Sequence, residues 1–416
     1  MSTVEGWTIK PLSEIADITM GQSPDSKYYT EEEKGLPFIQ GCAEFNARFP
    51  KAKLYCTQIK KIAPKSSILF SVRAPVGRIN IANQAYIIGR GLAAISGKNV
   101  NQDFLEKYIA HQEPFFRVAS QGSTFEAINT SELNKWQIHF PNNCAEQTKI
   151  AEILSCIDTA IEQTEAMIAK QQRIKTGLMQ DLLSKGIDEH GNIRTEQTHA
   201  FKDSELGRIP VGWEVGGFEN YVVSNAGIKS GPFGSSITKD MYVEQGYRVY
   251  GQEQVIGGTL DIGDYFITAR KFKEMETYSI DSGDVLISLM GTIGYVLIVP
   301  EIYHSGVINP RLLRFRPNMK CCLPEFLKAL LLSDPVRLQL EKFALGVTMQ
   351  GLSAGIIKKV SVVLIEIDEQ KRIFEVLATS EKHISSLFES LAKLKRQKTA
   401  LMQDLLSGNV RVNGLI

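Results

Sequence analysis

Several groups of residues in this chain are of the types that catalysis uses, but none has the required spacing. The six cysteines and six histidines form no Cys-x-x-Cys pair and no cluster at metal-ligand spacing. The stretch from Gly91 to Asn99 is similar to a phosphate-binding loop, except that five residues separate its glycines where four are needed. We therefore expect no catalytic residue, no metal and no cofactor bound by this chain itself.

Two further patterns are typical of enzymes that act on DNA. Pro24-Asp25 followed by Glu32 is similar to a metal-dependent nuclease pattern, but no apolar strand carries the carboxylates, so a surface turn is the preferred interpretation. Asn309-Pro310 begins like a motif of adenine methyltransferases, yet Arg311 stands where that motif has its second proline. Neither nuclease nor methyltransferase chemistry is predicted.

Length and composition limit the class of protein. The 416 residues are enough for two domains of roughly 150 residues with connecting helices. Apolar residues make up 43% and charged residues 22%, as in globular proteins, and no apolar run approaches the roughly 20 residues of a membrane span. The first residues, MSTVEGWTIKPLSE, contain no secretion signal. We expect a cytoplasmic protein with reduced thiols.

The charge is nearly balanced, with 47 basic and 46 acidic residues. Phosphate neutralisation supplies most of the non-specific affinity for nucleic acid, so this balance argues against a protein that binds DNA tightly alone. Residues 1–146 carry 16 basic and 14 acidic groups, and residues 187–366 carry 18 and 21. Neither half is predicted to be a basic patch.

An internal repeat organises the chain. Residues 147–184 align without a gap to residues 370–407, with 17 identities in 38 positions and a shared LMQDLLS at the end. Apolar residues recur in both copies with alternating spacings of four and three, which is typical of a coiled-coil helix. We predict that the two long helices pair antiparallel within the chain. The alternative is that each helix packs only on its own domain.

Lys175 and Lys398 occupy equivalent polar positions in the two copies of the apolar stripe. Such residues either set the register of the helix pair or face a partner. The sequence leaves both roles open.

The segments before the helices also repeat. Gly6-Trp7 matches Gly212-Trp213, Gly21 is aligned with Gly227, and ILFSVRAPVGRINIA is aligned with VLISLMGTIGYVLIV, which pairs Ser71 with Ser288. Strand-like runs such as SILFSVR and YRVYGQEQV mix with short helical ones. The predicted fold class is therefore α+β: two α/β domains separated by two long helices in an antiparallel coiled coil, with a pseudo-twofold internal repeat. The predicted boundaries are 1–146 for the first domain, 147–186 for the first helix, 187–210 for a linker, 211–366 for the second domain, 367–408 for the second helix and 409–416 for the tail.

Four stretches, together with the duplicated helices, resemble the specificity subunit of type I restriction-modification systems. They are SNAGIKSGPFGSSI, DVLISLMGTIGYV, GVTMQGLSAGIIKKVSVVLIEIDEQKRI and FKDSELGRIPVGW. The resemblance covers essentially the whole chain. It implies a non-catalytic DNA-recognition subunit whose two domains each read one half of a split target on double-stranded DNA, with the helices setting the spacing.

The resemblance also implies partners. Two methylation subunits would dock on the helices and domains, and motor-nuclease (restriction) subunits would complete the enzyme. S-adenosylmethionine, Mg and ATP would be bound by those partner subunits. Two alternatives stay open: an interaction scaffold whose domains bind peptides or glycans, and the recognition subunit of a related methyltransferase-nuclease.

Base reading requires hydrogen-bond donors and acceptors on loops that approach the DNA closely. In the first domain, Arg73 is the best candidate because a lone arginine at the end of an apolar strand often has a guanine or anionic partner. A buried ion pair is the alternative. The predicted DNA-binding residues of this domain are Gln22, Ser23, Lys27, Ser71, Arg73, Arg78, Gln121, Ser123 and Thr124.

In the second domain, a glycine-rich loop after Lys229 is either a DNA-contacting loop or an ordinary turn. The alternation of Arg311, Arg314 and Arg316 suits phosphate contacts, although a solvated strand face has the same pattern. The predicted DNA-binding residues are Lys229, Gly231, Phe233, Gly234, Ser235, Ser288, Met290, Thr292, Arg311, Thr348, Gln350 and Lys358.

Overall fold

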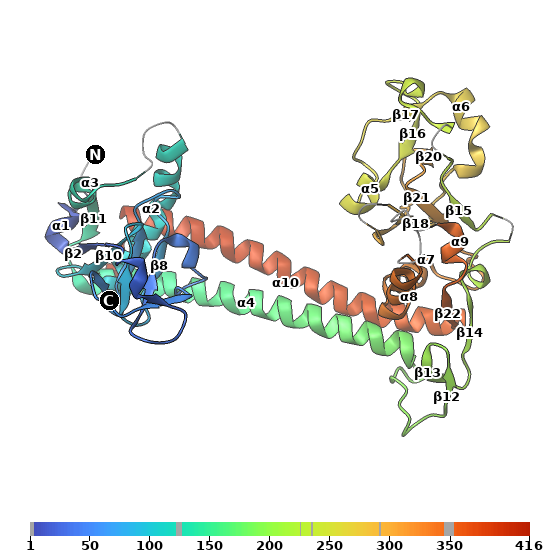
Figure 1. Ribbon diagram of the computed structural model, residues 1–416, viewed down its shortest axis with the longest axis horizontal. Helices are drawn as coiled ribbons and strands as arrows, with labels where there is room; N and C mark the ends of the chain where they lie inside the picture. Colours follow the sequence, from blue (N-terminus) through green and yellow to red (C-terminus); the bar gives the residue numbers. More distant parts are fainter. Residues whose placement is uncertain (1–3, 122–126, 225, 234–235, 291–292, 345–352) are drawn as a thin grey trace. The chain divides into compact units, whose positions relative to one another are not determined.

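The computed structural model describes residues 4–121, 127–224, 226–233, 236–290, 293–344 and 353–416 (Figure 1). It divides into two compact units, residues 1–166 with 388–416, and residues 167–387. Each unit holds one α/β domain and one half of each long helix. Among the described helices, none combines the length and the apolar character that crossing a bilayer would need.

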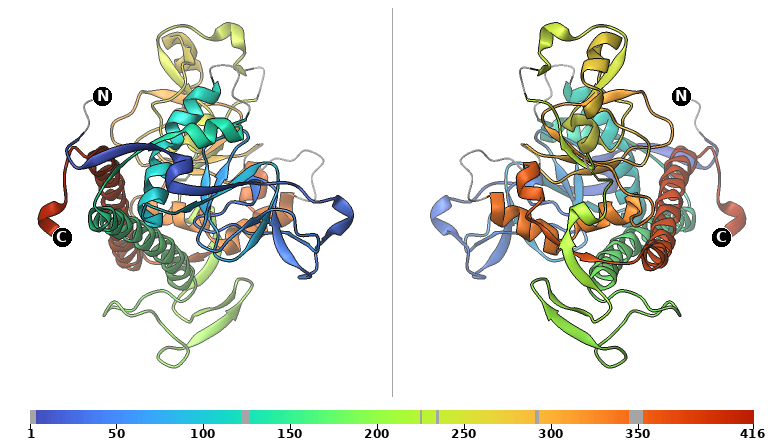
Figure 2. Two further views of the ribbon diagram at one scale, coloured as in Figure 1. Left: turned by 90° about the vertical axis from the view of Figure 1, so that its left-hand side faces the viewer. Right: turned by 90° about the vertical axis from the view of Figure 1, so that its right-hand side faces the viewer.

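The two long helices are α4 (Cys144–Ser184) and α10 (Ile367–Ser407), each of 41 residues. At 1.5 Å per residue each is about 62 Å long. Figures 1 and 2 show them side by side. In the first unit Lys398 of α10 pairs with Asp158 of α4, and in the second unit Lys175 pairs with Glu381, so the residue numbers run in opposite directions. The predicted antiparallel pair is confirmed.

Each helix begins at a repeated Glu-Gln pair that is fixed in its own unit. Gln147 donates to Pro141 O (2.8 Å) and Gln370 donates to Ile365 O (2.7 Å). The preceding Glu146 and Glu369 are buried carboxylates. Each glutamine thus ties the first turn of its helix to the backbone just before the helix, which explains why both copies of the repeat keep it.

The first domain contains two main sheets. The four-stranded sheet has the order β2-β10-β7-β8, and the five-stranded sheet has the order β3-β5-β4-β9-β6 with β4 and β9 parallel. Helix α2 (Gln102–Gln121) places Phe104 and Leu105 in one core with Phe70 and Ile95 of the four-stranded sheet. The strands are β1 (Trp7–Pro11), β2 (Ala16–Met20), β3 (Tyr29–Thr30), β4 (Leu36–Ile39), β5 (Leu54–Cys56), β6 (Ile62–Ala63), β7 (Ile68–Ser71), β8 (Ile79–Ile81), β9 (Tyr86–Ile88), β10 (Leu92–Gly97) and β11 (Gln137–Pro141), with short helices α1 (Leu12–Ile15) and α3 (Thr130–Lys135).

The second domain repeats this plan. A four-stranded sheet has the order β15-β21-β18-β19, and a three-stranded sheet has the order β17-β16-β20 with β16 and β20 parallel. Two-stranded pairs β1-β11 and β14-β22 lie at corresponding places in the chain order. The elements are β14 (Glu214–Gly217), β15 (Ile228–Ser230), β16 (Tyr247–Tyr250), α5 (Gln252–Gly257), β17 (Phe266–Ile267), α6 (Ala269–Glu274), β18 (Val285–Ser288), β19 (Val296–Ile298), β20 (Gly306–Ile308), β21 (Leu312–Phe315), α7 (Pro324–Leu332), α8 (Asp334–Ala344), α9 (Ala354–Ile357) and β22 (Ser361–Leu364).

Backbone hydrogen bonds establish which residues correspond. Ser71 N donates to Arg78 O (2.8 Å) and Ser288 N donates to Tyr295 O (3.0 Å), which confirms the predicted match of these two serines. Gly21 N donates to Leu92 O and Gly231 N donates to Leu312 O. Gly21 therefore corresponds to Gly231, and its predicted match to Gly227 is wrong. The segment from Trp213 to Gly231 is four residues longer than the segment from Trp7 to Gly21, and this accounts for the shifted match.

Two local predictions also need correction. In YRVYGQEQV only Tyr247–Tyr250 form a strand, because the Gln254 side chain accepts from Gly251 N (2.7 Å) and starts helix α5 there. The predicted linker is not wholly irregular: it contains a hairpin of β12 (Phe201–Ser204) and β13 (Gly207–Pro210).

Candidate nucleic-acid interface

A cavity of about 220 Å³ opens in the first domain where β4, β7 and β9 end. It brings together three of the predicted residues, Ser23, Ser71 and Arg73. It also contains Gln40 and Arg90, which were not predicted. The full lining is Ser23, Gln40, Gly41, Cys42, Ser71, Arg73, Ala74, Arg90 and Gly91.

Glycines allow the loops around this cavity to approach one another. A Cβ on Gly21 would lie 2.1 Å from Gly89 O, and a Cβ on Gly91 would lie 2.7 Å from Gln40 O. Both distances are too short for any side chain, so the sequence needs glycine at these positions. The Ser23 hydroxyl accepts from Arg90 N (3.3 Å), which ties the loop after β2 to the loop after β9.

The cavity presents cations without internal partners. Arg73 and Arg90 are exposed, and within the described residues neither has a carboxylate at ion-pair distance. The buried ion pair considered for Arg73 is therefore wrong. Burial raises the pKa of Tyr29, and the positive charge of Arg90 acts in the opposite direction. Two guanidinium groups and the Gln40 amide are the donor types that pair with guanine and adenine edges in the major groove.

Two features of the sequence could have revealed the missed residues. Arg90 lies between two glycines directly after the apolar strand Tyr86–Ile88, and Gln40 directly follows the apolar strand Leu36–Ile39. Each has the strand-end position that singled out Arg73. The sequence does not reveal that β4 pairs with β9, and it is this pairing that brings the two strand ends together.

The remaining described candidates of the first domain lie outside the cavity lining. Gln22, Lys27 and Arg78 are exposed. Lys27 lies 3.3 Å from the Asp25 carboxylate in a surface pair. Ser71, which does line the cavity, is buried, and its hydroxyl donates to Arg73 O (2.8 Å), so it shapes the turn that presents Arg73.

The corresponding region of the second domain has different side chains. Gly231 packs so closely that a Cβ would lie 1.8 Å from Asn309 O. The following Phe233 is 90% exposed and Met290 is 41% exposed. The Lys229 ammonium lies 4.9 Å from the centroid of the Tyr278 ring, a cation–π contact that fixes its direction. Ser288 is fully buried.

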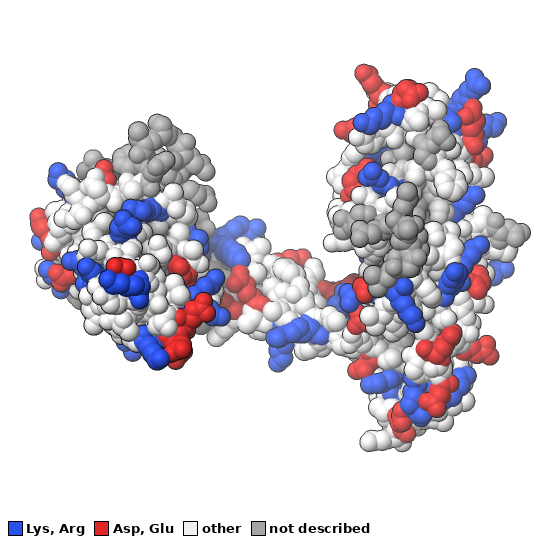
Figure 3. Space-filling model, in the orientation of Figure 1, with Lys and Arg blue, Asp and Glu red and all other residues white. Residues whose placement is uncertain are grey.

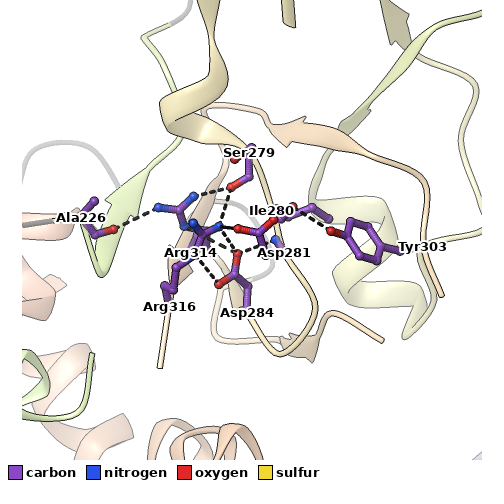
Figure 4. A network of polar contacts seen from close by, with 8 residues as sticks. All are labelled: Ala226, Ser279, Ile280, Asp281, Asp284, Tyr303, Arg314 and Arg316. Carbon is purple, nitrogen blue, oxygen red and sulfur yellow. Dashed lines mark hydrogen bonds and ion pairs between the residues drawn. The ribbon is translucent and has the colours of Figure 1, made fainter. Parts of the chain in front are cut away.

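The three arginines that alternate in sequence have different environments. Arg311 is exposed, as is Lys358. Arg314 and Arg316 instead belong to an internal network (Figure 4). Arg316 binds Asp284 through Nε (2.9 Å) and Nη2 (2.8 Å), and Arg314 donates to the carbonyl oxygens of Ser279 and Ala226.

The network of Figure 4 is structural. Arg314 is 2% exposed, so the prediction that it contacts phosphate is wrong. Burial and the nearby Arg316 lower the pKa of Arg314, whereas hydrogen bonding to Asp284 raises the pKa of Arg316. Buried charges need partners, and Asp284 supplies one to both arginines.

Some predicted residues cannot be placed. Gln121 is the last residue of α2, and nothing is described of its side chain. Outside the described residues lie Ser123, Thr124, Gly234, Ser235, Thr292, Thr348 and Gln350. Among the residues that are described, no three His, Cys, Asp or Glu side chains are grouped to hold a metal ion.

A model of the type I restriction modification DNA specificity domain matches residues 4–171 and 234–396 of this chain. Among curated relatives, the putative type I restriction enzyme MjaX specificity subunit of Methanocaldococcus jannaschii is 36% identical over 184 residues, which are 43% of each chain. The MjaVIII specificity subunit of the same organism is 23% identical over 99% of this chain and 94% of its own. The first match thus spans less than half of that relative, and the second spans nearly all of it.

Solved structures share the fold. The S subunit of a type I restriction-modification system from M. genitalium has a TM-score of 0.52 at 15% identity, covering 97% of this chain and 98% of its own. The HsdS subunit from Thermoanaerobacter tengcongensis has a TM-score of 0.54 at 17% identity, covering 99% of each chain. A chain from a study of complex assembly in a type I system has a TM-score of 0.65 at 16% identity, covering 99% and 100%. The family model matches both halves of the chain, and the solved structures share its fold. The chain therefore belongs to the type I restriction-modification DNA specificity family, as a non-catalytic specificity subunit.

Proposed function

We propose that the two domains read the two halves of one split target on double-stranded DNA. The observation that supports this most directly is that one scaffold carries unlike side chains at matching positions. Val72 N donates to Gly91 O, and Leu289 N donates to Arg311 O, so Gly91 corresponds to Arg311 and Arg73 to Met290. Two copies of one domain with different side chains at the same strand ends should recognise different bases.

In this proposal the arginines at the first cavity are the principal base-reading groups. Arg73 and Arg90 read purine edges together with Gln40, and Arg311, Lys229 and Met290 act in the second domain. The remaining predicted residues contribute phosphate or base contacts. Ser71 and Ser288 are both buried, so their proposed role is to stabilise the loops that follow β7 and β18.

The helix pair would set the distance between the two reading domains. Two readers on one face of a duplex must be separated by about one helical turn or a multiple of it, roughly 34 to 36 Å per turn. A helix of about 62 Å is long enough for that task. The predicted boundaries, with spacer helices at 147–186 and 367–408, belong to this part of the proposal.

Partners would supply the chemistry. We propose that two methylation subunits dock on the helices and domains, that motor-nuclease subunits join them, and that these partners hold S-adenosylmethionine, Mg and ATP. The proposed compartment is the cytoplasm, where such a complex meets DNA. An interaction scaffold for peptides or glycans is the competing function, and it predicts no DNA methylation.

The decisive experiment maps methylated bases. The chain is expressed with a type I methylation subunit with which it forms a complex, and the genome of the host is sequenced for modified bases. The expected result is one split motif with a fixed gap. The Arg73→Ala and Arg90→Ala variants should relax one half of the motif, and Arg311→Ala should relax the other half only. A continuous motif, or no methylation with an assembled complex, would refute the proposal.

A further inference from the structure

The two domains carry different charge in corresponding segments. Between the end of β4 and the start of α2, residues 40–101 contain ten Lys and Arg residues and one acidic residue. The corresponding segment between β16 and α7, residues 251–323, contains seven basic and eight acidic residues. The charge of each whole domain is close to balanced. Counting charges over whole domains, which led to the prediction of no basic patch in either half, therefore did not reveal the difference between these two segments.

The cations of the first segment are available for an external partner. All ten are exposed, and one of them, Lys98, is paired with Asp17 at 2.5 Å. Across the described ranges of the chain, the other nine have no carboxylate at ion-pair distance. They are Arg48, Lys51, Lys53, Lys60, Lys61, Lys65, Arg73, Arg78 and Arg90.

The cations of the second segment are largely neutralised inside the domain. Arg314 and Arg316 share Asp284, and Arg270 and Lys271 share Glu274. As far as the structure describes this segment, three cations have no ion pair, and they are Lys273, Arg311 and Lys320. A carboxylate beside a cation repels a phosphate, so a paired cation attracts a phosphate less strongly than an unpaired cation does.

The free cations of the first domain belong to loops that lead to the cavity. Arg48 O accepts from Ile81 N on β8 (3.0 Å), and β8 begins directly after Arg78. Lys61 O accepts from Ile88 N at the end of β9 (3.0 Å), two residues before Arg90. Figure 3 shows Lys and Arg side chains on the visible face of this unit. Two of the unpaired cations, Arg48 and Lys61, are therefore hydrogen-bonded through their backbone to the strands next to Arg78 and Arg90.

We propose that the first domain supplies most of the phosphate contacts of the subunit, and that the second domain contributes mainly base contacts. This inference rests on the proposed function, because it assumes that both domains meet one duplex. Phosphate contacts by unpaired cations release condensed counterions, and the association constant then falls steeply with salt. The asymmetry predicts that this salt dependence comes from the first domain.

The test compares two sets of four substitutions in the complex with the methylation subunits. One variant combines Lys51→Gln, Lys53→Gln, Lys60→Gln and Lys61→Gln. The matched control combines Arg208→Gln, Arg270→Gln, Lys271→Gln and Arg337→Gln, four cations of the second unit that each have a carboxylate partner. The association constant for a duplex with the mapped target is measured between 50 and 300 mM KCl, a range of about sixfold over which the slope is resolved.

The first variant should lose about 0.9 in the slope of log K against log salt for each phosphate contact removed, or about 3 to 4 in total. The control should lose less than about 1, and the methylated motif should be unchanged in both. Equal losses from the two variants would overturn the inference while leaving the proposed function intact. Weaker assembly of the complex, with an unchanged salt slope for the complex that still forms, would also overturn it, and would assign the lysines to an acidic face of a partner protein. A wild-type complex that does not prefer its mapped target would refute the proposed function instead.

Discussion

The Lys398 ammonium lies 2.7 Å from the Asp158 carboxylate, across the two long helices. Its counterpart in the repeat, Lys175, lies 2.5 Å from Glu381. The two lysines are 223 positions apart, and so are the two carboxylates, which is the offset between the two copies of the helix. One interaction thus occurs twice, once in each unit. Of the two roles open for these lysines, the structure supports the setting of helix register, because each lysine binds the opposite helix.

Asp158 should contribute stability that acid removes. Burial alone would raise its pKa, but hydrogen bonds and charges from Lys107 and Lys398 outweigh this and hold the pKa below its ordinary 3.8. The contribution is therefore complete above about pH 5 and is lost as the pH falls through the folded-state pKa. Asp158→Asn should cost about 1–2 kcal/mol at pH 7, because this partly buried pair lies between the exposed and the buried case, and less near pH 3. Denaturant unfolding at several pH values measures both.

A matched substitution on the same helix serves as the control. Glu152 forms an exposed pair with Lys149, so Glu152→Gln should change the free energy of unfolding by less than about 0.5 kcal/mol at any pH. A pH-independent loss in Asp158→Asn would show that packing, and not charge, is responsible.

Arg411 should stabilise the start of α4. Its guanidinium binds the fully buried Glu146 through Nε (2.6 Å) and Nη2 (2.8 Å), so Arg411→Ala leaves a buried carboxylate without its cation. We expect a loss of about 3 kcal/mol in the free energy of unfolding. Calorimetry of the full chain, read at the transition of the first unit, checks this value.

The repeat provides an internal comparison for that loss. Glu369 binds Arg194 and also accepts from Ile187 N (2.9 Å) and Trp213 Nε1 (3.1 Å). Arg194→Ala should therefore cost less than Arg411→Ala, because two hydrogen bonds remain. The reverse order would contradict this interpretation of the two sites.

Arg73 and Arg90 should affect DNA recognition and not folding. Each exposed guanidinium that reads a base is worth about 1–3 kcal/mol of discrimination, so Arg73→Ala or Arg90→Ala should weaken specific binding by about 5- to 150-fold. The midpoint of thermal unfolding should stay within a degree or two, since neither side chain has an internal partner among the described residues. Lys135→Ala, an exposed substitution in α3, is the control and should leave binding unchanged.

Asp284 should be required for folding of the second domain. It is 1% exposed, binds Arg316, and accepts from Asp281 N (2.7 Å). Asp284→Ala leaves Arg314 and Arg316 without their shared carboxylate and should cost about 3–5 kcal/mol. Hydrogen exchange of the strands in this domain would detect the loss.

Arg311→Ala is the informative contrast to that substitution. Arg311 belongs to the same run of sequence but is exposed, so its removal should alter DNA binding with less than about 0.5 kcal/mol of lost stability. If Arg311→Ala destabilised the second domain as severely as Asp284→Ala, Arg311 would also have a structural role, and its assignment as an exposed DNA-contacting residue would be contradicted.

The helical part of the fold could be predicted from sequence because its signal is local. The spacing of apolar residues in α4 and α10 and their shared LMQDLLS define two related rods, and a chain that returns through a domain can pair them antiparallel. The repeated order of domain and helix follows from the same alignment. A local periodicity needs no knowledge of distant contacts.

The site depended on contacts between distant residues. Arg311, Arg314 and Arg316 look alike in sequence, and only their position relative to Asp284, about 30 residues earlier, separates an exposed cation from two internal ones. In the first domain, Arg90 and Gln40 join Arg73 because parallel pairing of β4 with β9 brings their ends to one cavity. Sequence alone determined two related domains on paired helices, whereas burial and strand pairing decided which charged groups face outward, since both are properties of neighbours in space.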